Sequence, residues 1–162
     1  MKFPLRYLPV QLSQKDKIKE ARMLMKSKKF YKKGKYYTRQ KVKSFFNKPS
    51  NHVANARRIY GVENVSPTPE LARKTGCSIG ALEKIVNKGA GAYFSSGSRP
   101  NQTGQSWGLA RLASAITAGK AAAVDYDILQ DGCDHTGKAF ILANKSKRKY
   151  GYGHGKTRKV IA

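Results

Sequence analysis

The uneven charge of this chain limits what it can fold into more than any other feature. The first 48 residues carry 16 basic and 2 acidic side chains, and residues 145–162 carry 7 basic side chains and no acid. Residues 49–90 have a net charge of +3, and residues 91–144 have none. Self-repulsion of this strength destabilises a compact monomer and attracts polyanions or acidic protein surfaces. We therefore expect a nearly neutral body flanked by two basic arms that meet a negatively charged partner.

The apolar pattern predicts a mainly α fold. With 40% hydrophobic residues, 162 residues are enough for one core. Ser13, three residues before Asp16, predicts the start of a helix that runs from 14 to about 30. Further helix starts are expected at Ser50, Thr68, Ser78 and Ser106. The expected organisation is an extended N-terminal arm over 1–12, a helical body over 13–143 and a basic C-terminal tail over 144–162.

Residues 71–86 have the spacing of a helix-turn-helix-like pair. Ala72 allows close approach of two helices, Gly76 suits the turn, and Leu82 and Ile85 would bury the second helix. The leading end of that helix lacks the Arg or Gln that commonly reads base edges, and Glu83 would repel phosphate. The pattern therefore predicts a packing unit more strongly than a sequence-specific DNA reader.

Residues 89–108 contain five glycines and one proline and predict a long loop. Loops of this length in a compact chain are usually functional or held by a partner. The side chains expected to make its contacts, within the protein or with a neighbour, are Arg99, Asn101, Gln102 and Trp107.

Basic side chains alternate with aromatic ones between residues 26 and 43. This combination suits nucleic acid, where cations meet phosphates and rings stack on bases. A solvated basic helix face with aromatic anchors is the alternative. The expected polyanion- or partner-binding residues in this segment and in the tail are Lys26, Lys28, Lys29, Lys32, Lys33, Lys35, Arg39, Lys41, Lys43, Lys145, Lys147, Arg148, Lys149, Lys156, Arg158 and Lys159.

The sequence offers little for catalysis. Cys77 and Cys133 are expected to be reduced, buried thiols, and with His135 they make an incomplete set of zinc ligands. A Gly-Lys-Thr run at residues 155–157 lacks the earlier glycine of a phosphate-binding loop. No apolar run is long enough to span a bilayer. We expect no enzyme, cofactor, metal or small-molecule substrate, and a protein made in the cytoplasm.

Three stretches together resemble a known family: residues 44–61, 71–89 and above all 91–129, with SGSRPNQT, SW and ARLASA. Over roughly residues 5–143 the chain is similar to a family of small basic proteins of unknown function encoded by nucleocytoplasmic large DNA viruses of the phycodnavirus and mimivirus kind. The resemblance implies a viral origin and no established enzymatic activity, and it assigns no catalytic residue.

Two functions follow as expectations. In the first, the chain is a minor capsid protein of a large icosahedral DNA virus. It would lie in the virion against the major capsid protein and other minor capsid proteins, with its basic arms on acidic capsid surfaces, the inner membrane or the genome. In the second, it binds or packages viral DNA without sequence preference. In either case we expect nucleic-acid binding to be sensitive to salt.

Overall fold

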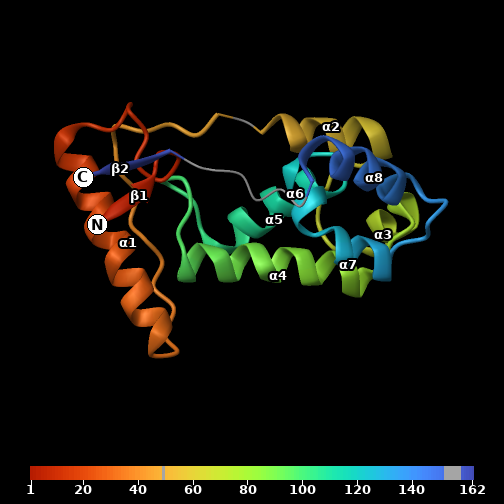
Figure 1. Cartoon of the computed structure of the whole chain (residues 1–162), viewed down its shortest axis with the longest axis horizontal. Helices are drawn as coiled ribbons and strands as arrows, with labels where there is room; N and C mark the ends of the chain where they lie inside the picture. The colour runs from red at the N-terminus through yellow and green to blue at the C-terminus, as the bar shows by residue number, and fades with distance from the viewer. Residues whose placement is uncertain (49, 152–157) are drawn as a thin grey trace. The chain divides into compact units, whose positions relative to one another are not determined.

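The computed structural model describes residues 1–48, 50–151 and 158–162. The expectation of a mainly α fold is confirmed: the described residues form eight helices and one two-stranded sheet (Figure 1). The chain does not form one body with two arms. It divides into two compact units, which we call unit 1 (residues 1–48, 90–107 and 156–162) and unit 2 (residues 49–89 and 108–155).

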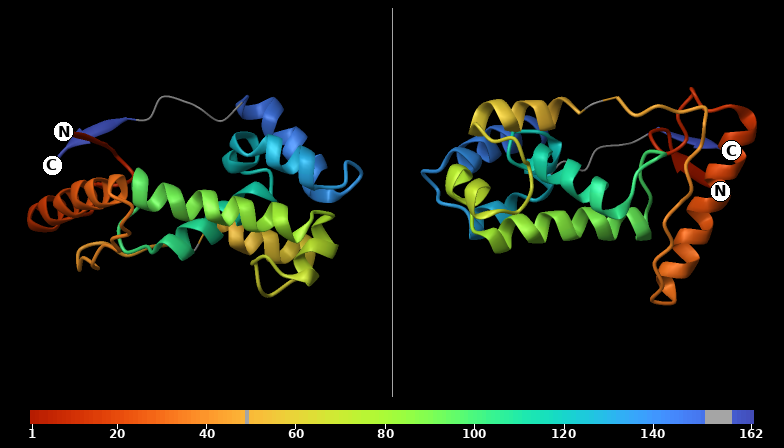
Figure 2. Two further views of the ribbon diagram at one scale, coloured as in Figure 1. Left: turned by 90° about the horizontal axis from the view of Figure 1, so that it is seen from below. Right: turned by 180° about the vertical axis from the view of Figure 1, so that it is seen from behind.

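Unit 1 is built on one long helix and the two ends of the chain. Helix α1 spans Gln14–Lys32, and its N-cap is Ser13, whose side chain accepts the Asp16 N–H as expected. Strand β1 (Lys2–Pro4) pairs antiparallel with β2 (Lys159–Ile161), and Phe3 lies opposite Val160. Figures 1 and 2 show the two chain ends side by side.

Apolar residues of the N-terminal segment form the core of unit 1. Phe3, Leu8 and Leu24 are almost fully buried, and Val160 of β2 packs against their cluster. Residues 1–12 and 159–161, which we expected to be arms ordered by a partner, therefore contact their own chain. The alternation of apolar and polar residues in 1–12 reflects the burial of one side of this segment.

Unit 2 is entirely helical in its described residues. Its elements are α2 (Asn51–Tyr60), α3 (Pro69–Thr75), the first part of α4 (Ile79–Ser95), most of α5 (Gly104–Ala115), α6 (Lys120–Val124), α7 (Tyr126–Gly132) and α8 (Lys138–Tyr150). The caps follow the sequence: Ser50 and Thr68 accept backbone N–H groups, and Gly61 and Gly76 end their helices in the left-handed conformation. Helix α8 includes residues 144–150, so this part of the expected tail is helical.

The long loop expected over 89–108 is wrong in extent. Helix α4 continues to Ser95 and α5 begins at Gly104, which leaves only residues 96–103 as loop. The glycines serve a helix crossing: a Cβ on Gly89 would lie 2.6 Å from the Cα of Gly108, and one on Gly108 would overlap the Val86 carbonyl oxygen. α5 runs beside α4 in Figures 1 and 2. Close backbone approach, which no larger residue permits, explains their composition.

Helices α3 and α4 lie on either side of a turn at Gly76, where the helix-turn-helix-like pair was expected. Gly76 has a φ of 79°, and Ser78 accepts the Ala81 N–H at the start of α4. The two helices are thus present with the expected turn, and their pairing as a helix-turn-helix remains a prediction.

The two cysteines are not reduced thiols but form a disulfide, which corrects our expectation. Cys77 follows α3 and Cys133 follows α7, and their Cα atoms are 3.8 Å apart. They form an isolated antiparallel bridge, flanked by hydrogen bonds from Ser78 N to Gly132 O and from Asp134 N to Gly76 O. Nothing in the sequence indicated this pairing, because 56 positions separate the two residues.

Candidate binding site of the basic unit

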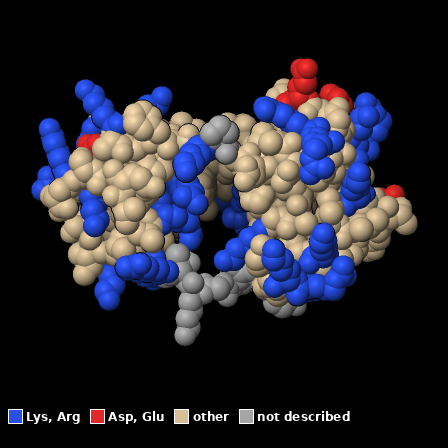
Figure 3. Space-filling view, turned by 90° about the horizontal axis from the view of Figure 1, so that it is seen from above, with Lys and Arg blue, Asp and Glu red and all other residues tan. Residues whose placement is uncertain are grey.

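The charge of the protein is concentrated in unit 1. By sequence this unit holds 20 of the 33 basic residues and 2 of the 9 acidic ones, so it carries +18 of the net +24. The two basic ends of the sequence belong to the same folded unit. On the face drawn in Figure 3, Lys and Arg side chains project over much of the surface and acidic ones are few.

Both acids of unit 1 are engaged by groups of the same unit. The Asp16 carboxylate accepts the backbone N–H (3.0 Å) and the hydroxyl (2.6 Å) of Ser44. The Ser44 hydroxyl and N–H hold the pKa of Asp16 below its usual value of 3.8. The second acid, Glu20, is fully buried. Neither carboxylate is left to offset the exposed lysines around it.

Arg39 holds four segments of unit 1 together from a buried position. Its Nε donates to Glu20 Oε1 on α1 (2.8 Å), and its Nη2 donates to Ser98 Oγ (2.5 Å) in the loop after α4. Its backbone N–H donates to the Tyr93 hydroxyl (2.9 Å), and its guanidinium lies 4.4 Å from the centre of the Tyr93 ring. Arg39 is only 6% exposed, so it is a structural residue and not part of a polyanion surface.

The ion pair of Glu20 and Arg39 is incomplete in its hydrogen bonds. Within the described residues, Glu20 Oε2 and Arg39 Nη1 are buried without a partner. Burial raises the pKa of the Glu20 carboxyl above its usual value of 4.5, while the Arg39 guanidinium acts in the opposite direction. Removal of either residue would leave the other buried and unpaired, which is more costly than the pair.

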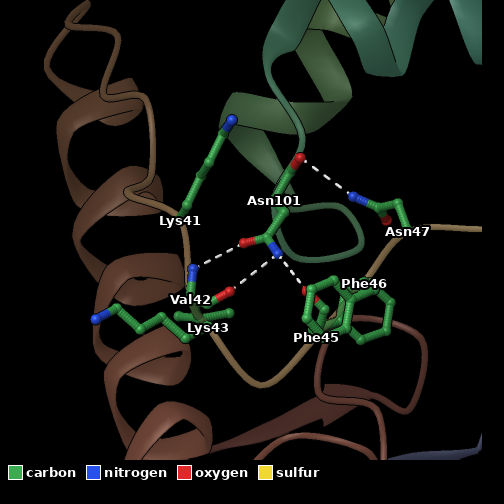
Figure 4. A pocket seen from close by; sticks show the side chains of 7 residues that line it. All are labelled: Lys41, Val42, Lys43, Phe45, Phe46, Asn47 and Asn101. Carbon is green, nitrogen blue, oxygen red and sulfur yellow. Dashed lines mark hydrogen bonds between the residues drawn. The ribbon is translucent and has the colours of Figure 1, made fainter.

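Asn101 fixes the segment that carries the exposed lysines (Figure 4). Its Oδ1 accepts the Val42 N–H (2.7 Å), and its Nδ2 donates to the carbonyl oxygens of Val42 (3.1 Å) and Phe45 (2.7 Å). Asn47 Nδ2 in turn donates to the Pro100 and Asn101 carbonyl oxygens. Asn101 has a φ of 62°, a conformation that asparagine tolerates better than most residues. The expectation that Asn101 makes loop contacts is therefore met within unit 1.

A pocket of about 630 Å³ lies beside this clamp. Figure 4 shows Lys41 reaching along one side of it and Lys43 pointing away toward α1. Phe45 is buried in the core, whereas the adjacent Phe46 is 84% exposed. The pocket was missed in the sequence because Phe46 and Asn47 lie just beyond the basic run that we singled out. Its lining consists of Lys41, Val42, Lys43, Phe45, Phe46, Asn47 and Asn101.

The expected basic residues between 26 and 43 are exposed or half-buried, apart from Arg39. Two of them contact aromatic rings: Lys26 Nζ lies 4.5 Å from the ring centre of Tyr37, and Lys28 Nζ lies 5.7 Å from that of Phe3. The exposed members of this set are Lys26, Lys29, Lys32, Lys33, Lys35, Lys41 and Lys43.

The expected basic tail is divided between the two units. Lys145, Lys147, Arg148 and Lys149 lie on α8 of unit 2, where Lys147 Nζ is 4.1 Å from the ring centre of Tyr126. Arg158 and Lys159 belong to unit 1 and are exposed. Lys156 lies outside the described residues.

The other expected loop residues have mostly local roles. Gln102 Oε1 accepts the Ser106 hydroxyl (2.7 Å), Trp107 is half-buried, and the Arg99 side chain is exposed. Arg39, rather than Arg99, is the arginine that fixes this loop, through the Ser98 side chain and the Arg99 carbonyl oxygen.

Unit 2 has its own buried charge cluster. Asp125, between α6 and α7, accepts two hydrogen bonds from Arg111 (both 2.7 Å) and one from Lys88 Nζ (2.9 Å). The Asp125 side chain is fully buried, while Lys88 is half exposed. This cluster ties α4 and α5 to the α6–α7 junction and is a structural feature of the unit.

Two other kinds of feature are absent from the part of the chain that the structure describes. No group of three or more His, Cys, Asp or Glu side chains in it could hold a metal ion. None of its helices is both long and apolar enough to cross a membrane.

The fold and the site define a small, mainly helical, strongly basic protein with a charged unit built from both ends of its chain. A family model matches residues 4–132, and the chain belongs to that family, a family of unknown function (DUF5824). No curated protein and no solved structure matches the chain.

Proposed function

We propose that this protein is a non-catalytic structural protein that binds polyanionic surfaces through unit 1. The concentration of charge supports this proposal: +18 in 73 residues, with both acids engaged internally. A surface of this kind gains affinity from the release of counterions when it contacts phosphates, and it needs no sequence-specific contact. Its working location would be the virion of a large icosahedral DNA virus. There it would act as a minor capsid protein beside the major capsid protein and contact acidic capsid surfaces or the genome.

Duplex-DNA binding by charge-matched variants tests the role of unit 1. The first variant replaces Lys26, Lys29, Lys32 and Lys33 by Gln, and the control replaces Arg73, Lys74, Lys84 and Lys120 of unit 2. All eight side chains are exposed, so neither set disturbs a core. The unit 1 variant is expected to bind more weakly, with a log–log salt slope that is less steep by about 0.9 for each phosphate that the protein no longer neutralises. Equal effects of both variants would contradict a dedicated basic unit.

Quantitative protein analysis of purified virus particles tests the proposed location. A minor capsid protein is expected at a fixed ratio to the major capsid protein. Absence from particles, with abundance in infected cells, would contradict the capsid assignment.

Non-specific DNA binding or genome packaging is the second candidate, favoured by the exposed aromatic ring of Phe46 beside Lys41 and Lys43. It predicts that the protein leaves the particle with the genome and not with the shell when particles are opened. A preference of more than about a hundredfold for one DNA sequence would contradict both candidates, because electrostatic binding supplies no such discrimination.

A further inference from the structure

The exposed ring of Phe46 stands out in unit 1. The neighbouring Phe45 is 8% exposed and belongs to the core, whereas Phe46 is 84% exposed. A single apolar side chain on a surface needs no explanation by itself. Phe46, however, lines a pocket of about 630 Å³ together with two lysines, which sets it apart from the equally exposed Val10 of the same unit.

The backbone beneath Phe46 is held in place before any ligand arrives. Asn101 makes three hydrogen bonds to the backbone of residues 42 and 45, and Asn47 makes two to the loop backbone. The loop itself is tied to Arg39 through Ser98. A ring on a fixed backbone loses less conformational entropy on binding than a ring on a free segment.

The surroundings of the ring are positive. Lys41, Lys43 and Lys48 are all exposed, and the segment 33–48 contains no acid. The loop 96–103 contains no acid either and adds the exposed Arg99. A ligand that suits this site is therefore anionic and also offers a flat apolar face.

We propose that the pocket at Phe46 is a binding site for single-stranded nucleic acid, in which an unpaired base stacks on the Phe46 ring while Lys41 and Lys43 contact flanking phosphates. This inference rests on the proposed polyanion-binding function and names its ligand. Stacking on aromatic rings within a basic groove is the general mode of single-strand binding. A duplex keeps its bases stacked on one another and offers no free base to the ring. A membrane surface fits less well, because interfacial binding grows with buried apolar area and Phe46 is a single ring.

Fluorescence anisotropy of the full-length protein tests the proposal. The probes are a labelled oligothymidylate of about 15 nucleotides, within the range that single-strand binding domains cover, and a labelled duplex of the same length. Phe46→Ala is expected to weaken binding of the oligothymidylate about fivefold or more and to change duplex binding by less than about twofold. Phe46→Trp is expected to retain binding, and Val10→Ala provides the control for an exposed apolar residue distant in sequence from the pocket.

The outcomes separate this inference from the proposed function. If the wild-type protein binds neither probe nor polyphosphate at low salt, the polyanion-binding function itself is wrong. If it binds them but Phe46→Ala weakens both probes equally, or neither, the stacking site is wrong and the general function stands. Phe46-dependent binding to phosphatidylglycerol vesicles, with no effect on oligothymidylate, would also overturn the site. Circular dichroism of each variant checks that the fold is intact.

Discussion

At the scale of single residues, the pair of Glu20 and Arg39 supports unit 1. We expect Glu20→Gln to reduce the free energy of unfolding by about 3 kcal/mol or more, because it leaves the Arg39 guanidinium buried without a counter-charge. Arg39→Lys is expected to cost a similar amount, since an ammonium cannot reach Glu20 and Ser98 with one rigid fork. Urea unfolding of the purified variants measures both effects.

The double variant Glu20→Leu/Arg39→Met provides the matched comparison for this prediction. Replacement of both charges by apolar side chains of similar volume often restores or exceeds the original stability. We expect the double variant to be more stable than either single variant. Additive losses in the two single variants and the double variant would show that the residues do not act as a pair.

The pH dependence of unit 1 should include a contribution from Asp16. Hydrogen bonds from Ser44 lower the pKa of this carboxyl in the folded chain. Its stabilising effect is therefore fully present above the unfolded value near 3.8, and it is lost as the pH falls through the lower folded value. In Ser44→Ala the pKa of Asp16 should move back up toward 3.8, as measured by NMR titration.

Asp134 provides an internal control for this titration. Its pKa is lowered by hydrogen bonds from Thr136, in unit 2, and should be unchanged in Ser44→Ala. A parallel shift of both carboxyls would point to a general loosening of the protein and not to the loss of one hydrogen-bonding partner.

At the scale of elements, the disulfide joins the turn after α3 to the turn after α7. In the chain-entropy model, closing a loop of 56 residues stabilises the folded state by about 4 kcal/mol. We expect Cys77→Ala/Cys133→Ala to lose a comparable amount of unfolding free energy under non-reducing conditions. In the presence of a strong reductant the variant and the wild type should unfold at similar urea concentrations. A difference that persists in reductant would assign the effect to packing of the two buried side chains.

Strand β2 gives a second test at this scale, with adjacent residues as test and control. Val160 packs against the core of unit 1, whereas Ile161 is 61% exposed. Val160→Asp is expected to detach β2 and speed hydrogen exchange at the Leu5 amide, which donates to the Arg158 carbonyl oxygen (2.8 Å). Ile161→Asp should leave this exchange nearly unchanged. Equal protection in both variants would show that the β1–β2 pairing does not depend on this burial.

The sequence predicted the starts of helices better than their lengths or contacts. Ser13, Ser50, Thr68 and Ser78 cap as expected, because capping depends on a side chain and an N–H two or three residues away. The crossing of α4 and α5 depends on two glycines that are distant in sequence, so local composition suggested a loop. The disulfide, the Arg39 contacts and the Phe46 pocket are likewise products of tertiary structure.

At the scale of the whole molecule, the unequal division of charge determines what each unit can contact. The sequence indicated two basic ends, but not that both ends belong to one unit with +18 of the total +24. Local sequence patterns do not indicate this, because Lys48 and Arg158 lie 110 positions apart. Unit 1 therefore gathers the basic side chains of both ends, and unit 2, at +6, can meet a different kind of neighbour.

The pairing of β1 with β2 also sets the order in which the two units can mature on the ribosome. Unit 2 consists of residues 49–89 and 108–155, so all of its segments are synthesised before residues 159–161. Unit 1 requires residues 159–161 to complete its sheet, and its first 48 residues must wait for them. A strongly cationic surface that is completed after unit 2 would shorten the time during which the nascent chain presents a finished polyanion site beside the RNA-rich ribosome.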